Sequence, residues 1–505
     1  MLVNNILFNT LSRLVNLSSH YLFIPVYIYF LGIEGYGVIG IYIVLFSFLT
    51  FTDFGMTATI TRQMALNGDK YKLPKNKKTI FSTFEITYFL VCVSLFALGL
   101  IFLEPISSIF FNQSQGIVED KTNIFFLISL ALLFQLPSSL YIGALMGLEK
   151  QFTANTLISI AAVSRGILAI SFLYMESSLE SFFLSQILVN ICYLIFLRIA
   201  VMRNFTSFKK TKKFDVQVIK DNLAFSSNMA LLSILGVILI NSDKLLVASL
   251  LSLKDVGVYT LAFNLSMLPI MLCQIISISC YPTIIKEVEE FQESRFKEFY
   301  EDINSLLATF LIPLSLTLIF FNYHISFAWI GSVELSKDVY FYSIILIAAQ
   351  SIQGTTMLAY YFALSREVTR PQILIATFSV IMLLPVMYFS IGSYGLYGAS
   401  YTLFFCILIS YPFGIIYLNK NSYKVSLSSY SVMPYMSTLL ILLPIFFFLS
   451  YIPLDPFASR TLDFLLIIAV FFIGLLVATI KNYTHLEKYI LLLKSSLKSS
   501  LKNNF

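Results

Sequence analysis

Long apolar runs separated by short polar or charged segments recur from one end of the chain to the other. A membrane-crossing helix needs about 20 apolar residues, and a window of about 19 residues finds such helices. The pattern therefore predicts an all-α integral membrane protein. Its spans number about fourteen and cover residues 9–31, 36–62, 80–103, 122–147, 153–175, 181–202, 223–251, 257–283, 303–323, 339–364, 372–391, 396–418, 432–452 and 462–481.

A Gly-rich turn with Gly32, Gly35 and Gly37 joins the first two spans. Shifting the sequence by 220 residues places Leu31–Val38 on Leu251–Val258, so that Gly37 falls on Gly257. Two-repeat construction with a site between the halves is typical of transporters. The repeat predicts four parts: an N-lobe (1–210), a C-lobe (211–425), two further helices (426–481) and a basic tail (482–505).

Charge fixes the expected orientation. Only 12% of the 505 residues are charged and 58% are hydrophobic, whereas soluble domains are about a quarter charged. If the N-terminus is cytoplasmic, nearly all of the 33 Lys and Arg fall on the cytoplasmic side, and the outside loops hold only Lys121, Lys254, Lys337 and Arg460. Cytoplasmic loops are rich in Lys and Arg. Both ends of a multi-pass membrane protein are therefore predicted to be cytoplasmic.

A few ionisable groups lie inside the apolar runs. Arg165 is near the centre of span 153–175, where a charge costs about 2.5–3.5 kcal/mol. We expect it to handle a substrate or an ion, with a buried structural pair as the alternative. Asp243 and Lys244 lie in the outer third of span 223–251. Adjacent helical residues point about 100° apart and need not pair, and Lys244 is expected to snorkel outward.

Polar residues form stripes on three spans. Thr50, Asp53, Thr57 and Thr61 share one face of span 36–62, either for coupling or as a hydrogen-bonded seam between helices. The first span carries a face with Arg13, Asn16 and His20, and span 339–364 one with Gln350, Gln353, Met357 and Tyr360.

The first-span stripe has two interpretations for each ionisable member. His20 titrates near neutral pH and suits either proton coupling or a hydrogen-bonded core. Arg13, near the inner end, is a substrate contact or a membrane anchor. Glu85, near the inner end of span 80–103, is expected to reach water.

No catalytic motif is evident. The chain lacks a Walker sequence, an HExxH motif and a Ser/His/Asp arrangement. The five Cys lie in apolar runs without a CxxC, and only three His are present. We therefore predict no enzymatic activity, cofactor or metal, and transport driven by an ion gradient, a substrate gradient or a partner.

The first hairpin resembles that of the Wzx-type polysaccharide flippases, in the multidrug/oligosaccharidyl-lipid/polysaccharide exporter superfamily. The resemblance rests on Pro25 in the first span, on Leu31-Gly32 and Tyr36-Gly37 in the turn, and on Asp53-Phe54-Gly55 ahead of Arg62. It implies two six-helix lobes around a cationic cavity. It also implies a location in a bacterial inner membrane, where an undecaprenyl-diphosphate-linked O-antigen or capsule repeat is moved from the cytoplasmic to the periplasmic leaflet by alternating access. The polymerase and chain-length regulator of that pathway would be further partners.

The resemblance assigns roles to the intramembrane groups. The substrate cavity would be lined by Arg13, Asn16, Arg62, Arg165, Lys244, Gln350, Gln353 and Tyr360, and coupling or gating would use His20, Asp53 and Asp243. With only Lys244 as a deep cation, the C-lobe departs from a symmetric cationic cavity.

Two other functions fit a bundle of this kind. A proton- or sodium-coupled multidrug or metabolite antiporter would use buried carboxylates, but Arg165 disfavours a cationic cargo. A membrane polymerase would need a long polar outside loop, whereas the outside segments here are short.

Overall fold

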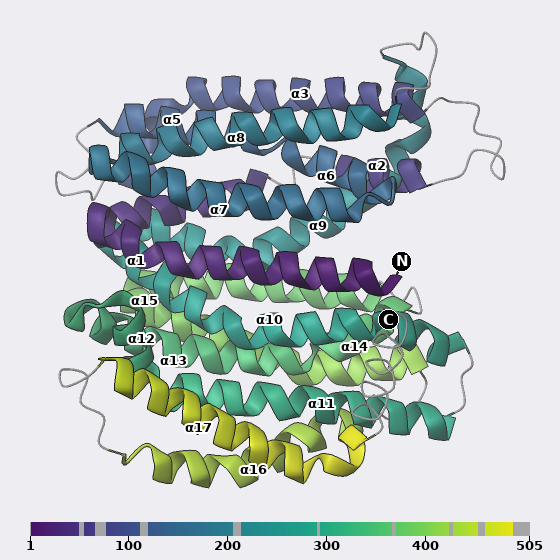
Figure 1. Cartoon of the computed structure of the whole chain (residues 1–505), viewed down its shortest axis with the longest axis vertical. Helices are drawn as coiled ribbons and strands as arrows, with labels where there is room; N and C mark the ends of the chain where they lie inside the picture. Colours follow the sequence, from purple (N-terminus) through teal and green to yellow (C-terminus); the bar gives the residue numbers. More distant parts are fainter. Residues whose placement is uncertain are drawn as a thin grey trace, which may run out of the picture. The chain divides into compact units, whose positions relative to one another are not determined.

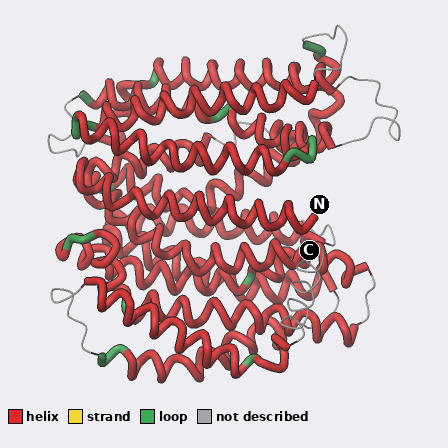
Figure 2. Tube along the Cα trace, in the orientation of Figure 1, coloured by secondary structure: helices red, strands yellow, loops and turns green. Residues whose placement is uncertain are grey.

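The computed structural model describes residues 2–49, 55–65, 77–111, 120–205, 214–289, 293–365, 370–423, 428–452 and 460–487. Every regular element in these ranges is helical (Figure 2). Eleven helices in the described part are long and apolar enough to cross a membrane. The predicted all-α membrane fold is confirmed. The count of fourteen spans and the cytoplasmic ends stay predictions.

The chain divides into two compact units, Met1–Gly257 and Val258–Phe505. Each is described by itself. The division does not test the lobe boundaries expected from the sequence, which stay predictions.

Most helices of the first unit pack against a neighbour along much of their length. Helix α1 packs on α7 and α9, α7 on α8, α8 on α5, and α2 on α6; α3, α5 and α8 run alongside one another in Figure 1. The helices are α1 (Leu2–Leu49), α2 (Met56–Ala65), α3 (Lys77–Ile101), α4 (Leu103–Phe111), α5 (Lys121–Gln135), α6 (Ser138–Gly147), α7 (Gln151–Met175), α8 (Leu179–Met202) with a short 3-10 turn (Arg203–Phe205), and α9 (Val216–Leu250).

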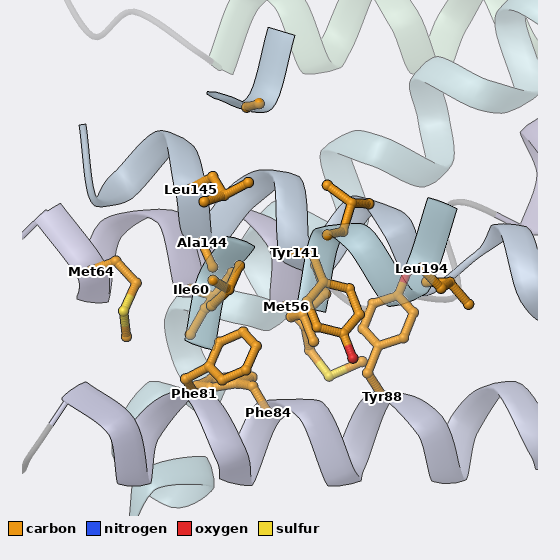
Figure 3. Packing of buried hydrophobic residues seen from close by; sticks show 14 of the residues in the cluster. Met56, Ile60, Met64, Phe81, Phe84, Tyr88, Tyr141, Ala144, Leu145 and Leu194 are labelled. Atoms are coloured by element: carbon orange, nitrogen blue, oxygen red, sulfur yellow. The ribbon is translucent and has the colours of Figure 1, made fainter. Parts of the chain in front are cut away.

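The core of the first unit joins α2, α3, α6 and α8. Ile60, Phe81 and Tyr141 are almost completely buried there, with Met56 and Leu194 beside them (Figure 3). Between membrane helices such packing contributes van der Waals contact rather than a hydrophobic driving force. The close fit of these side chains therefore sets how the four helices align.

Several spans are not the single straight helices expected from the sequence. The first two spans are separate, as expected: α1 comprises two helices that meet in a kink at Gly32, with φ 70° and ψ 177°, a conformation that glycine adopts readily. The second span is interrupted at Gly55, which has φ 71° and directly precedes α2. Span 122–147 is also divided, at Pro137, which has no N–H to continue the ladder.

The two turns of the sequence repeat meet within the first unit. A Cβ on Gly37 would collide with the backbone oxygen of Leu253, and one on Gly257 would collide with that of Ile33. The shift that aligns the repeats also aligns Ile33 with Leu253. The contact is therefore reciprocal, and two backbones approach more closely than any side chain would permit.

In the second unit α11 packs on α16 and α17, and α13 packs on α15. Its helices are α10 (Leu253–Glu289, beginning in the last residues of the first unit), α11 (Glu293–Phe320), α12 (Asn322–Ile330), α13 (Val333–Thr355), α14 (Met357–Ser365), α15 (Arg370–Tyr423, broken at Gly395 with φ 57°), α16 (Ser428–Leu449) and α17 (Arg460–Lys481).

Buried polar side chains tie α11 to α16 and to the end of α17. The Tyr435 hydroxyl donates to Asn304 Oδ1 at 3.0 Å. Asn482 Nδ2 donates to Thr309 Oγ1 at 2.8 Å, and His485 Nδ1 lies 2.7 Å from Asp302 Oδ1. In hydrocarbon such bonds add to helix association because the alternative is an unsatisfied polar group.

Candidate functional site

The strongest candidate site surrounds Arg165, near the middle of α7. The side chain is half-buried. Its Nε and Nη2 donate to Asn190 Oδ1 on α8, at 3.3 and 3.1 Å. Charge-assisted hydrogen bonds of this kind offset part of the cost of desolvating a guanidinium.

Asn190 is positioned by a third helix. It is fully buried, and its Nδ2 donates to the backbone oxygen of Ala131 on α5 at 3.1 Å. This bond directs the amide oxygen toward Arg165. One turn away, Gln186 Nε2 donates to the Arg165 backbone oxygen at 3.4 Å, so α7 and α8 are joined at two points.

Aromatic rings surround the guanidinium. The Arg165 Cζ lies 5.5 Å from the centroid of the Tyr193 ring, a cation–π contact worth about 0.5–2 kcal/mol. The charge also reaches the hydroxyls of Tyr27 and Tyr42 on α1. The Tyr42 hydroxyl donates in turn to Gln135 Oε1. The site is thus a cation against the Tyr193 ring of α8, with two tyrosines of α1 within the range of its charge.

No carboxylate neutralises Arg165 within the described part of the chain; its side-chain hydrogen bonds go to the Asn190 amide, and its ring contact is with Tyr193. The expected alternative of a buried structural ion pair is therefore not what the described residues form. A positive charge held by neutral partners keeps its attraction for an anion.

Helix α1 lies close against α7 on one side of this site. The Ser12 hydroxyl donates to the Asn155 backbone oxygen at 3.1 Å and lies 2.9 Å from the Ser159 hydroxyl. Further along, a Cβ on Gly166 would overlap the Phe23 ring. Small residues on α7 therefore allow α1 to approach and bring Tyr27 and Tyr42 within range of Arg165.

A family model described as polysaccharide biosynthesis protein matches residues 2–287. The match covers more than half of the chain. The chain belongs to this family. The resemblance predicted from the first hairpin is thereby confirmed.

One curated relative and two solved structures extend the comparison. A candidate O-antigen transporter of Shigella flexneri is 22% identical over 374 residues, 73% of this chain and 86% of its own. Lipid II flippase MurJ, in an inward closed conformation, has a TM-score of 0.70 at 16% identity, over 95% of this chain and 99% of its own. An inward-facing multidrug resistance MATE family transporter has a TM-score of 0.62 at 13% identity. The match covers 81% of this chain and 96% of that transporter's chain. These two structures show the fold alone.

In this polysaccharide biosynthesis protein, Lys244 is buried. It is 8% exposed, and its Nζ donates to Asp243 Oδ1 at 3.2 Å and to the Ile240 backbone oxygen at 2.7 Å. The expectation that Lys244 snorkels outward is wrong. Asp243, at 1% exposure, offers a buried partner next to it, and a neighbouring carboxylate compensates a buried ammonium better than hydrocarbon does.

The first-span stripe is only partly described. The side chain of Arg13 lies outside the described residues. Asn16 Nδ2 donates to the Ser12 backbone oxygen at 2.9 Å. His20 is exposed, and its ring meets Tyr21 edge-on with centroids 5.6 Å apart. These contacts of Asn16 and His20 are local ones within α1.

The second-span stripe ends in a seam between helices. Asp53 lies outside the described residues. Thr61 Oγ1 donates to the Thr57 backbone oxygen at 2.8 Å and to that of Gly143 on α6 at 3.0 Å. Thr61 thus joins α2 to α6, whereas the buried Thr57 hydroxyl has no partner among the described residues; the choice between the two interpretations of the stripe stays open. Arg62, in the last turn of α2, is exposed.

The stripe expected on span 339–364 does not share one helix. Helix α13 ends at Thr355 and α14 begins at Met357. Gln350, on α13, is 4% exposed and its Oε1 lacks a partner in the described part of the protein. Gln353 is half-buried and precedes the break, whereas Tyr360 on α14 is 41% exposed. The four residues are thus divided between two helical segments.

Sequence reasoning missed Asn190, Gln186 and Tyr193. In chain order, Gln186, Asn190 and Tyr193 recur at i, i+4 and i+7 within span 181–202, which places them on one helical face. That stripe was the available signal. It also missed the partners of Glu85, which is buried beside Tyr141 and Arg198 instead of reaching water.

Proposed function

We propose that this protein moves an undecaprenyl-diphosphate-linked O-antigen or capsule repeat unit from the cytoplasmic to the outer leaflet of a bacterial inner membrane. The observation that carries the proposal is the environment of the Arg165 guanidinium in the first unit. The Asn190 amide and the Tyr193 ring hold it, and among the described residues no carboxylate pairs with it. The family match to polysaccharide biosynthesis proteins supports it, as does the relative described as a candidate O-antigen transporter.

The physical reason is the cost of moving a diphosphate through hydrocarbon. Burying an unpaired anion is strongly unfavourable, and a guanidinium offers several N–H donors to phosphate oxygens. Arg165 uses Nε and Nη2 on Asn190, which leaves Nη1 for a ligand. Arg13 and Arg62 are the further proposed cations. Lys244 is a weaker one because Asp243 neutralises it.

The sugar part of the cargo needs hydrogen-bonding side chains. Asn16, Gln350, Gln353 and Tyr360 are proposed for this, and Gln350 has a buried amide oxygen without a partner in the described residues. The lipid tail would remain in the bilayer. Alternating access would change the side from which the cargo is reached, with His20, Asp53 and Asp243 as proposed coupling or gating groups.

The test is deletion of the gene in its own host, with rescue by wild type, Arg165→Ala, Arg165→Lys or Lys150→Gln. Lys150 is an exposed residue ahead of α7 and serves as the control for loss of a cation. Mass spectrometry of undecaprenyl-linked sugars and a surface-polysaccharide gel give the readout, with membrane levels of each variant measured in parallel.

We expect deletion to abolish surface polymer and to accumulate single lipid-linked repeats. Wild type and Lys150→Gln restore the polymer, and Arg165→Ala does not. Arg165→Lys restores it partly, because lysine keeps the charge but lacks the paired N–H donors of the guanidinium. Intact surface polymer after deletion overturns the proposal. Intact polymer together with new sensitivity to cationic dyes favours the antiporter instead.

A further inference from the structure

A second buried charge cluster lies in the first unit, away from Arg165. Glu85 on α3 is 8% exposed. Its Oε1 accepts from the Tyr141 hydroxyl on α6 at 2.6 Å and from Arg198 Nε on α8 at 2.9 Å. Tyr141 belongs to the core shown in Figure 3. One carboxylate oxygen thus fixes a tyrosine and an arginine from two other helices.

Arg198 is held by one side only. Its side chain is 61% exposed, and its single bond to a described residue uses Nε. The two Nη groups have no partner in the described part of the chain. Because Glu85 restrains the inner edge of the guanidinium, its outer edge presents N–H donors in a fixed direction, the geometry that phosphate oxygens accept.

An apolar groove begins at this guanidinium. Its volume is about 430 Å³, and it is lined by Glu85, Ile86, Phe89, Leu90, Val93, Tyr141 and Arg198. Leu90 and Val93 are 60% and 52% exposed. They lie on the candidate membrane span of α3, where an apolar surface faces lipid chains. The apolar lining of the groove fits a hydrocarbon chain, and its end at Arg198 fits a phosphate.

Glu85 and Arg198 also lie toward the predicted cytoplasmic ends of their helices, where anionic lipid headgroups are found. Glu85 is in the third turn of α3, and Arg198 lies four residues before α8 ends at Met202. The segments beyond these ends carry the Lys and Arg that predict the cytoplasmic side. That leaflet is the anionic one, and basic pockets between helices on this side bind phospholipid headgroups.

We propose that Glu85, Tyr141 and Arg198 form a binding site for an anionic glycerophospholipid of the cytoplasmic leaflet. Arg198 Nη1 and Nη2 bind the phosphate, Glu85 positions the guanidinium, and one acyl chain lies along Ile86, Phe89, Leu90 and Val93. The site does not rest on the proposed transport function, because every contact in it is made within α3, α6 and α8.

The experiment measures lipid retention by native mass spectrometry after purification of the full chain. The protein is incubated with phosphatidylglycerol or with zwitterionic phosphatidylcholine of the same chains. The main variant is Glu85→Gln/Arg198→Gln, which removes both charges and leaves no buried carboxylate without its partner. Leu90→Trp fills the groove, and Lys150→Gln is the control for an exposed cation at the same end. Thermal unfolding of each variant establishes that it is folded.

We expect wild type and Lys150→Gln to retain phosphatidylglycerol over phosphatidylcholine. The double variant loses about tenfold in phosphatidylglycerol retention, the size expected for lost charged hydrogen bonds, and Leu90→Trp weakens retention of both lipids. Equal retention by wild type and the folded double variant overturns the site. Displacement of phosphatidylglycerol from wild type by equimolar undecaprenyl phosphate also overturns it, since the occupant is then the carrier lipid.

Discussion

Gly37 and Gly257 each face the other repeat's turn, and neither position has room for a Cβ. The Cβ of an alanine at 37 would meet the Leu253 oxygen, and that of an alanine at 257 would meet the Ile33 oxygen. Equivalent residues of the two turns therefore make equivalent contacts, as in a two-fold interface. The faint sequence repeat thus has a physical counterpart inside the first unit.

Gly37→Ala and Gly257→Ala are each expected to destabilise the protein by about 1–3 kcal/mol, because the two backbones must separate to admit a methyl group. Thermal unfolding of the detergent-purified protein measures this. Gly236→Ala is the control, since a Cβ there has nothing within 4 Å and alanine favours helix by about 1 kcal/mol. Equal melting temperatures for all three variants would contradict the close contact.

Asn190→Asp is expected to impair the proposed transport strongly while the protein stays folded. The substitution places a carboxylate against Arg165, and the new ion pair offsets the lost bond to the Ala131 oxygen. Since a neutralised guanidinium no longer attracts a diphosphate, surface polymer in the rescue assay should fall by about tenfold or more. Asn204→Asp is the control, because the described bonds of the Asn204 amide go to backbone oxygens at the end of the adjoining α8. Full rescue by Asn190→Asp would show that the free charge is not needed.

Lys244→Met should be strongly destabilising, by on the order of 3 kcal/mol, because it removes the ammonium beside the buried Asp243 carboxylate. Asp243→Asn/Lys244→Met removes both charges and should recover most of that loss. Denaturant or thermal unfolding gives both values. If the double variant is no more stable than the single one, Asp243 does not depend on Lys244.

Asn482→Ala should loosen the attachment of the end of α17 to α11. Asn482 is 1% exposed and its amide donates to Thr309 Oγ1 at 2.8 Å, so its removal is expected to cost about 1 kcal/mol. Hydrogen exchange should rise in residues 475–487 more than in α13. Asn204→Ala, whose described bonds join a 3-10 turn to the end of α8, should leave this segment unchanged. Unaltered exchange in 475–487 would argue against the link.

The sequence by itself determined that the chain is an all-α membrane protein, and it located Arg165 as the deep cation. Hydrocarbon requires long apolar helices and makes a central charge expensive, so both features are visible in hydropathy alone. The family could also be predicted from the sequence, because the Gly-rich turn and the residues after it form a local motif.

Tertiary structure decided which groups meet. Glu85, expected to reach water, is enclosed by Tyr141 and Arg198, and Lys244, expected to snorkel, is buried with Asp243. The partners of Glu85 lie on other helices, and no pattern along α3 reveals them. Asn190 became part of the site only because α5 and α8 pack so that its amide bridges Ala131 and Arg165. Hydropathy reports the depth of a residue, whereas its neighbours follow from the rotation and packing of each helix.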